Sequence, residues 1–170
     1  MNDTATLSAT GVTEVVRADY DNPKHAADIV TMLRSYAMDP MGGGEDLSAE
    51  VRAALVPGLK ATPAASSLLA YIGDEAVGLA NLMQTFSSFG GKPLLNIHDI
   101  AVSKDHRGTG IGRRLFEEIH KMADEMGACK VTLEVLEGNE PAKALYASLG
   151  YGDYVLDPKM GKAMFWQKRL

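Results

Sequence analysis

Hydrophobic and polar residues follow one another between Leu94 and Gly127 in a pattern that predicts a strand, a turn and a helix. Residues 94–102 form a short apolar run without proline, which is typical of a mostly buried strand. Polar residues at 103–106 end that run. Apolar residues then recur at steps of three or four, at Ile111, Leu115, Ile119, Met122 and Met126. This spacing lines one face of an α-helix.

The chain before this stretch carries the signals of three strands and two helices. We expect strands over 13–18, 68–72 and 76–83, and helices over 23–36 and 48–59. Asp21, Asn22 and Pro23 mark the start of the first helix, with proline in its first turn, and Ser48 is expected to be the N-cap of the second. Residues 64–67 and 86–93, rich in small or turn-forming residues, are expected to be connections.

The chain after the predicted central helix begins with Gly127, a typical helix stop. A strand is expected over 130–136, and strand, helix and strand in succession predict a parallel pair. Pro141 and Gly150 bracket a short helix. Two last strands are expected over 151–156 and 163–167.

Three glycines at alternate positions, Gly108, Gly110 and Gly112, stand where the predicted strand turns into the helix. Glycine lets the backbone curl toward a ligand, and the free amides of a helix start favour an anion such as phosphate. Arg113 stands where the dinucleotide fingerprint needs glycine, and no GK[ST] follows, so two common nucleotide motifs are excluded. A tight turn without a ligand is the alternative interpretation.

The arrangement Arg107-x-x-Gly110-x-Gly112 resembles the acetyl-CoA pyrophosphate loop of the GNAT N-acetyltransferase superfamily. A second block, 131–151, resembles the next motif of that family, with Asn139 after a strand and Tyr146 on a short helix. Within the superfamily, residues 89–150 look most like spermidine/spermine N-acetyltransferases. The resemblance implies an α/β fold with a mixed twisted sheet of six to seven strands flanked by about four helices.

The resemblance also implies acetyl-CoA as co-substrate and direct transfer of its acetyl group to an amine. Backbone groups of the strand end and the glycine turn would bind the coenzyme, and Arg107 would add positive charge. The residues that the resemblance assigns to cofactor binding are Ile100, Ala101, Val102, Arg107, Gly108, Thr109, Gly110, Ile111, Gly112, Asn139 and Tyr146.

Two residues are assigned catalytic roles. Tyr146 matches the position of the family's general acid, and a phenol can protonate a leaving thiolate. His98 stands where the polyamine enzymes carry a carboxylate, and imidazole is suited to moving protons at neutral pH. Strand alternation places Asp99 on the opposite face unless a bulge intervenes, and Asn96 shares the face of His98, so an ordered water is another candidate base. His98 and Gly138 depart from the polyamine pattern, which leaves the acceptor open.

Composition narrows the class of protein. The 170 residues suit a single domain over 13–170 behind a flexible N-terminus, 1–12, and 46% are hydrophobic. A net charge of −5 disfavours nucleic acid, and no apolar segment suggests a signal peptide or membrane span, so we expect a cytoplasmic enzyme. Residues 1–60 hold nine acidic and five basic side chains. This charge suits a cationic acceptor at the entrance, or is simply a solvated acidic surface.

The sequence therefore predicts an N-acetyltransferase, an acyltransferase that modifies a primary amine of a small molecule. Two alternatives stay open: a module that binds acyl-CoA without turnover, and an enzyme acting on a protein N-terminus or lysine. The four histidines are scattered, so no metal is expected, and the single Cys129 is interpreted as core packing. A homodimer is implied by the resemblance alone.

Overall fold

The computed structural model describes residues 14–170, and the chain divides into two compact units, 1–133 and 134–170. Within the described residues, the first unit holds the sheet and three of the α-helices, and the second holds the fourth. The flexible N-terminus expected over 1–12 lies outside the described residues. The single domain over 13–170 stays a prediction.

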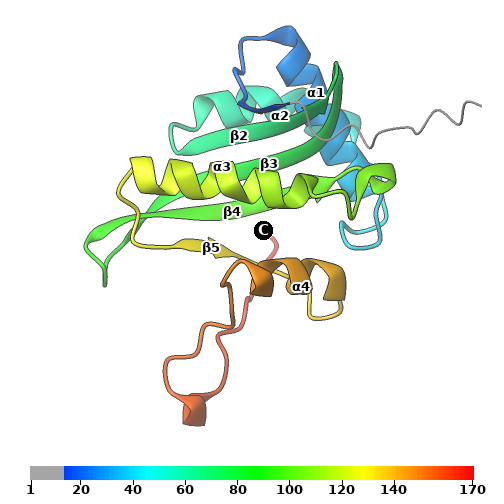
Figure 1. The fold of residues 1–170 in the computed structure, drawn as a ribbon. Helices are drawn as coiled ribbons and strands as arrows, with labels where there is room; N and C mark the ends of the chain where they lie inside the picture. The colour runs from blue at the N-terminus through cyan, green and yellow to red at the C-terminus, as the bar shows by residue number, and fades with distance from the viewer. Residues whose placement is uncertain (1–13) are drawn as a thin grey trace, which may run out of the picture. The chain divides into compact units, whose positions relative to one another are not determined.

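The sheet has five strands in the order β1-β2-β3-β4-β5, which is also their order along the chain (Figure 1). The first four pair antiparallel, and β4 and β5 pair parallel. Gly73, with a positive φ of 58°, and Asp74 form the hairpin turn between the second and third strands. The strands are β1 (Glu14–Arg17), β2 (Ala65–Ile72), β3 (Glu75–Ser87), β4 (Lys92–Val102) and β5 (Val131–Leu133).

Three helices cover the sheet: α1 (Pro23–Ala37), α2 (Ala49–Ala61) and α3 (Ile111–Glu125). The predicted starts of α1 and α2 are confirmed, as is the predicted N-cap Ser48. The side chain of Asn22 accepts from two N–H groups at the start of α1, and the hydroxyl of Ser48 accepts from Val51 at the start of α2. Within residues 14–170, no helix is long and apolar enough to cross a membrane.

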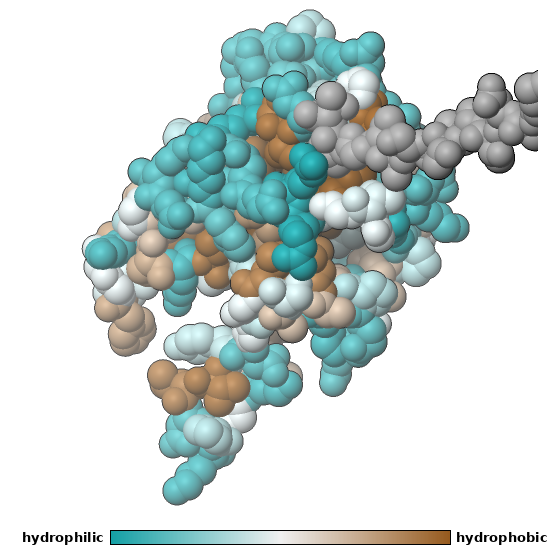
Figure 2. Space-filling view, viewed as in Figure 1, coloured by the Kyte–Doolittle hydropathy of each residue, from teal (hydrophilic) through white to brown (hydrophobic). Residues whose placement is uncertain are grey.

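The two faces of the sheet pack against different helices. Leu69, Tyr71 and Leu79 form one core cluster with side chains of α1 and α2. The neighbouring residue Gly78 faces the other side of the sheet, because a Cβ placed on it would lie 3.0 Å from Ile111 of α3. Figure 1 accordingly shows α3 in front of the sheet and α1 and α2 behind it. The outward surface of α3 is hydrophilic (Figure 2), as the predicted amphipathic pattern requires.

A β-bulge interrupts the pairing of β3 and β4. Leu82 pairs with Ile97, whereas the preceding Asn81 pairs with Asp99, so His98 is the extra residue. The parallel partner β5 pairs with β4 only at Leu95–Ile97. Beyond that point β4 continues to Val102 without β5 beside it.

The second unit contains α4 (Glu140–Ser148) and a 3₁₀ turn, Pro158–Met160, and its described residues form no strand. The strands predicted over 151–156 and 163–167 are therefore wrong, and the strand predicted over 130–136 shortens to 131–133. Within this unit the N–H of Ala163 donates to the carbonyl of Tyr154 at 3.2 Å, which joins the two stretches. A sheet of only two strands is marginally stable in water. The α/β class is confirmed, with five strands in the described residues instead of six or seven.

Large apolar side chains are exposed in this second unit. Leu156, Phe165 and Trp166 are 86%, 79% and 81% exposed. The sequence pattern predicts strands here because these residues are apolar, yet within the unit nothing packs over them.

Candidate active site

The glycine turn, residues 107–112, joins β4 to α3. Gly108 and Gly110 have φ angles of 77° and 92°, a region that side chains with a Cβ rarely adopt. Two side-chain hydrogen bonds stabilise the turn. The hydroxyl of Thr109 donates to the carbonyl of His106 at 2.6 Å, and His106 Nδ1 lies 2.8 Å from the hydroxyl of Ser103. The predicted turn is thus a fixed loop.

The backbone amides of the glycine turn are available to a ligand. Among the described residues, no acceptor bonds to the N–H groups of residues 108–112. A Cβ on Gly108 or Gly110 would meet no atom within 4 Å, so space is open beside the backbone. Unpaired amides at a helix start, next to open space, suit an anion such as a phosphate.

The side chain of Arg107 bonds two groups of the protein itself, in addition to lying at the edge of the glycine turn. Its Nη2 donates to Oδ2 of Asp39 at 2.8 Å, and its Nε donates to the carbonyl of Val102 at 3.2 Å. The N–H of Met41 and the guanidinium of Arg107 lower the pKa of Asp39, so this carboxylate is charged at neutral pH. The side chain of Asp39 is 14% exposed and that of Arg107 is 50% exposed. Arg107 therefore links the glycine turn to the loop after α1.

The end of β4 forms the wall beside the turn. Ile100, Ala101 and Val102 pair with β3 on one side, and β5 no longer accompanies them on the other. All three are partly buried. This is where the family resemblance places the acetyl group and the pantetheine arm.

The bulge changes which side chains meet at this wall. His98 is exposed on the bulge, and Asp99 turns to the face that carries α1, where its Oδ2 accepts from Nδ2 of Asn81 at 3.0 Å. The bulge that the sequence analysis allowed as an exception is therefore present, and its extra residue shifts the register of Asp99. Asn96 instead donates to Thr132 of β5 at 3.1 Å.

A buried polar chain leads to Asp99. The Ser67 hydroxyl donates to Oδ1 of Asn81 at 2.7 Å, and the Tyr20 hydroxyl lies 3.0 Å from that of Ser67. Burial raises the pKa of Tyr36 on α1, and the negative charges of Asp99 and Asp39 raise it further. The pattern of the sequence does not predict these neighbours. Asn81 was the available signal, because it is the one polar residue in the apolar run 76–83.

Basic side chains close by neutralise part of the acidic excess of residues 1–60. Asp46 forms two hydrogen bonds to Arg34, at 3.0 and 2.6 Å, and lies 3.6 Å from Arg52. Asp28 pairs with Lys24 at 2.7 Å. The acidic excess of residues 1–60 is thus a set of paired carboxylates rather than a diffuse acidic entrance. Asp99, outside that segment, is an acidic residue of β4 itself.

The second unit carries the two other predicted site residues. Asn139 caps α4, since its side-chain oxygen accepts from the N–H of Ala142 at 3.3 Å. The rings of Tyr146 and Tyr151 lie 6.3 Å apart. Burial, and then Tyr146, raises the pKa of Tyr151 to about 12. The roles of Asn139 and Tyr146 toward a coenzyme stay predictions.

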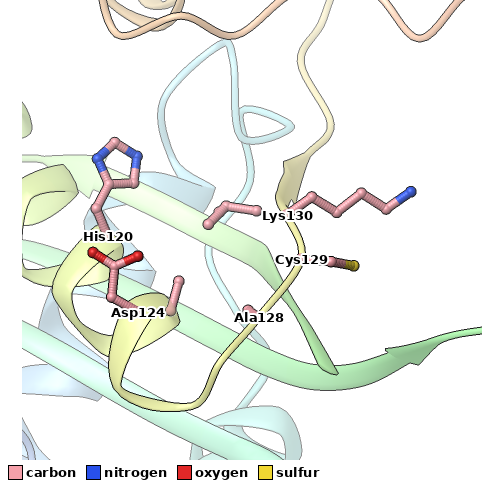
Figure 3. Close-up of a pocket in the computed structure, with 7 residues that line it drawn as sticks. His120, Asp124, Ala128, Cys129 and Lys130 are labelled. Carbon is pink, nitrogen blue, oxygen red and sulfur yellow. The ribbon is translucent and has the colours of Figure 1, made fainter. Parts of the chain in front are cut away.

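A cavity of about 220 Å³ lies near the C-terminal end of α3, and no predicted site residue lines it. Cys129 lines it and is exposed, so the core role predicted for this residue is wrong. Figure 3 shows its sulfur pointing away from His120 and Asp124. Among the described residues, no three His, Cys, Asp or Glu side chains are grouped to hold a metal.

Residues 30–151 match the profile of the acetyltransferase (GNAT) family. Over 101 residues the chain is 37% identical to an uncharacterized protein of Mycobacterium leprae, which covers 56% of this chain but only 26% of that protein. It is 24% identical to a thialysine N-epsilon-acetyltransferase of Caenorhabditis elegans, over 76% of this chain and 78% of that enzyme.

The fold also matches solved structures. An aminoglycoside acetyltransferase from an uncultured soil metagenomic sample, crystallised with sisomicin, superposes with a TM-score of 0.74 at 16% identity. The match covers 92% of this chain and 96% of that one. At this identity the likeness concerns the fold.

Proposed function

The chain belongs to the acetyltransferase (GNAT) family, and from this premise we propose that it transfers an acetyl group from acetyl-CoA to a primary amine of a small molecule. The observation that carries the proposal is the glycine turn. Its amides at 108–112 have no acceptor among the described residues, and space is open beside Gly108 and Gly110. The family match spans this turn and reaches into the second unit.

In this proposal the amides of the glycine turn hold the pyrophosphate of acetyl-CoA. Gly108 and Gly110 have positive φ angles, a conformation typical of anion-binding turns, and the dipole of α3 adds favourable potential at its start. Arg107 has donors beyond those that bond Asp39 and Val102, and it adds one positive charge. The unpaired edge of β4 at Ile100–Val102 offers backbone groups to the pantetheine arm and the acetyl carbonyl.

The transfer needs a base and an acid. His98, exposed on the bulge, takes one proton from the incoming ammonium, so that its nitrogen can attack. The new N–C bond forms as the C–S bond breaks. Tyr146 supplies a proton to the departing thiolate, and the nitrogen releases its second proton to solvent. One ammonium and one thioester thus give one amide, one thiol and one proton.

The acceptor in this proposal is a small cationic amine. Asp99 provides negative charge at the β4 wall, and the nematode relative is by name an acetyltransferase of the amino acid analogue thialysine. The solved relative binds the aminoglycoside sisomicin. A homodimer and a cytoplasmic location stay predictions from the sequence.

The test is an acceptor panel in which release of CoA thiol is followed with acetyl-CoA and thialysine, spermidine, sisomicin or a lysine-containing peptide. We expect thiol release with at least one small amine and little with the peptide. Release with the peptide alone would favour a protein substrate. Protection from thermal unfolding by acetyl-CoA without thiol release would instead identify a binding module.

A further inference from the structure

Three polar side chains lie in one row across the middle of the sheet. Ser67 of β2 pairs with Asn81 of β3, and Asn81 pairs with Asp99 of β4. Ser67 and Asn81 are each 1% exposed, in strands whose other central residues are apolar. Burying polar groups costs free energy unless they are hydrogen-bonded, so this row needs an explanation.

The hydrogen bonds in the row can run in only one direction. Asp99 can only accept, so the amide nitrogen of Asn81 must face it, at 3.0 Å, and the amide oxygen must face Ser67. The single hydroxyl proton of Ser67 then goes to Asn81. Tyr20, 3.0 Å away, must in turn donate to Ser67. We call Tyr20, Ser67 and Asn81 the donor chain, because every bond in it points toward Asp99.

The donor chain fixes one oxygen of Asp99 and leaves the other for a ligand. Asn81 bonds Oδ2, and among the described residues nothing bonds Oδ1. The bulge at His98 is what brings Asp99 to this face, beside Tyr36 of α1. The carboxylate is therefore held rigidly where the β4 wall loses its β5 neighbour.

We propose that the donor chain is a positioning device that holds the carboxylate of Asp99 to bind the cationic acceptor amine, with Asn81 as the residue that acts on it directly. This inference rests on the proposed function and deepens it, since it assigns the amine's counter-charge to Asp99. A charge-assisted hydrogen bond to a pre-oriented carboxylate gives both affinity and direction. His98, next to Asp99, remains the base.

The test compares Tyr20→Phe, Asp99→Asn and the double variant in the full chain. Tyr20→Phe removes only the first hydroxyl, on a side chain that is partly exposed, so the fold should survive. We expect the KM of the best amine in the panel to rise about tenfold or more in Asp99→Asn, which corresponds to about 1.4 kcal/mol, and a few-fold in Tyr20→Phe. The KM of acetyl-CoA should stay unchanged in both.

The double variant separates positioning from mere stability. If Tyr20 acts through Asp99, adding Tyr20→Phe to Asp99→Asn raises the amine KM no further. Ser87→Ala is the matched control, because Ser87 is also a buried strand hydroxyl but bonds only the turn amide of Gly90. Additive effects, an equal rise in the KM of acetyl-CoA, or an equal effect of Ser87→Ala would overturn the inference.

Calorimetric binding of thialysine, spermidine and sisomicin keeps this inference distinct from the proposed function. Binding that Asp99→Asn and Tyr20→Phe weaken, in a protein that releases no thiol, would support the amine site and refute acetyl transfer. Thiol release with an amine KM that neither variant changes would support transfer and refute the role of Asp99. If none of the three amines binds or reacts, the inference is wrong.

Discussion

Arg107 in the glycine turn donates to Asp39, 68 residues earlier in the chain, over 2.8 Å. The guanidinium that the family resemblance assigns to the coenzyme is thus already held by a carboxylate. Arginine has five N–H donors, so one guanidinium can bond a carboxylate and a phosphate at once. The pair ties the loop after α1 to the proposed pyrophosphate site.

Removing this guanidinium should weaken the coenzyme site specifically. We expect Arg107→Ala to raise the KM of acetyl-CoA about tenfold, the loss of one charge-assisted contact of about 1.5 kcal/mol. Asp39→Asn should not raise it, because the arginine keeps its charge. Arg52→Ala is the control, since Arg52 only approaches Asp46. Steady-state thiol release measures the KM of acetyl-CoA for all three variants. Equal effects of Arg107→Ala and Arg52→Ala would contradict the role of Arg107 at the coenzyme site.

The ion pair of Arg107 and Asp39 predicts that the stability of the fold depends on pH. The pKa of Asp39 is lowered in the folded state, by the N–H of Met41 and by Arg107, so its contribution is present above the unfolded pKa of about 3.9. It is lost as the pH falls through the folded pKa. The difference in Tm between wild type and Asp39→Asn should be constant from about pH 5 to 8 and shrink below about pH 4. A difference in Tm that persists to pH 2 would show that the charge of Asp39 does not stabilise the fold.

Tyr146 is expected to matter for the chemical step rather than for binding. Tyr146→Phe should lower kcat about 10²- to 10⁴-fold, the range for loss of a general acid, and leave the KM of acetyl-CoA nearly unchanged. Tyr151→Phe is a matched control, because its ring lies 6.3 Å from that of Tyr146. Similar kcat values for wild type and Tyr146→Phe would remove the tyrosine from the mechanism.

His98 is expected to matter for the chemical step as the base. In His98→Ala we expect kcat/KM for the amine to fall about 10²-fold, the range for loss of a general base, while the KM of acetyl-CoA stays nearly unchanged. His25→Ala, which alters a histidine on α1, should keep the wild-type rate. A kcat/KM of His98→Ala equal to that of wild type would assign the base to Asp99 or to water.

Gly78 is required by packing between the sheet and α3. A Cβ there would lie 3.0 Å from Ala70 and Ile111 and 3.1 Å from Leu115, closer than side chains normally approach. Gly78→Val should therefore lower the free energy of unfolding by about 1–3 kcal/mol. Gly58→Ala in α2, where nothing lies within 4 Å, should raise it by about 0.5–1 kcal/mol. Denaturant unfolding compares the two.

Local signals in the sequence predicted most elements because their causes are local. The caps at Asn22 and Ser48 and the stop at Gly127 depend on residues within one helical turn, and all three are found. The glycine turn was likewise readable from its spacing. The helix face predicted for α3 is buried at Ile111, Leu115 and Ile119.

What the sequence could not predict depends on partners far along the chain. The bulge at His98 arises from the register between two strands, and no local pattern reveals one extra residue. The pair of Arg107 with Asp39 and the bond of Asn81 to Asp99 are contacts of the folded chain alone. The last two predicted strands fail for the same reason, because a strand requires a neighbour that composition does not supply.

The exposure of Trp166 gives the protein a built-in optical reporter. The chain has one tryptophan, so all indole fluorescence comes from the segment near its C-terminus, where this ring is 81% open to water. Its emission should therefore be red-shifted and readily quenched by iodide. Any event that covers this segment, whether a coenzyme, an amine or a second copy of the chain, would register as a blue shift without a label.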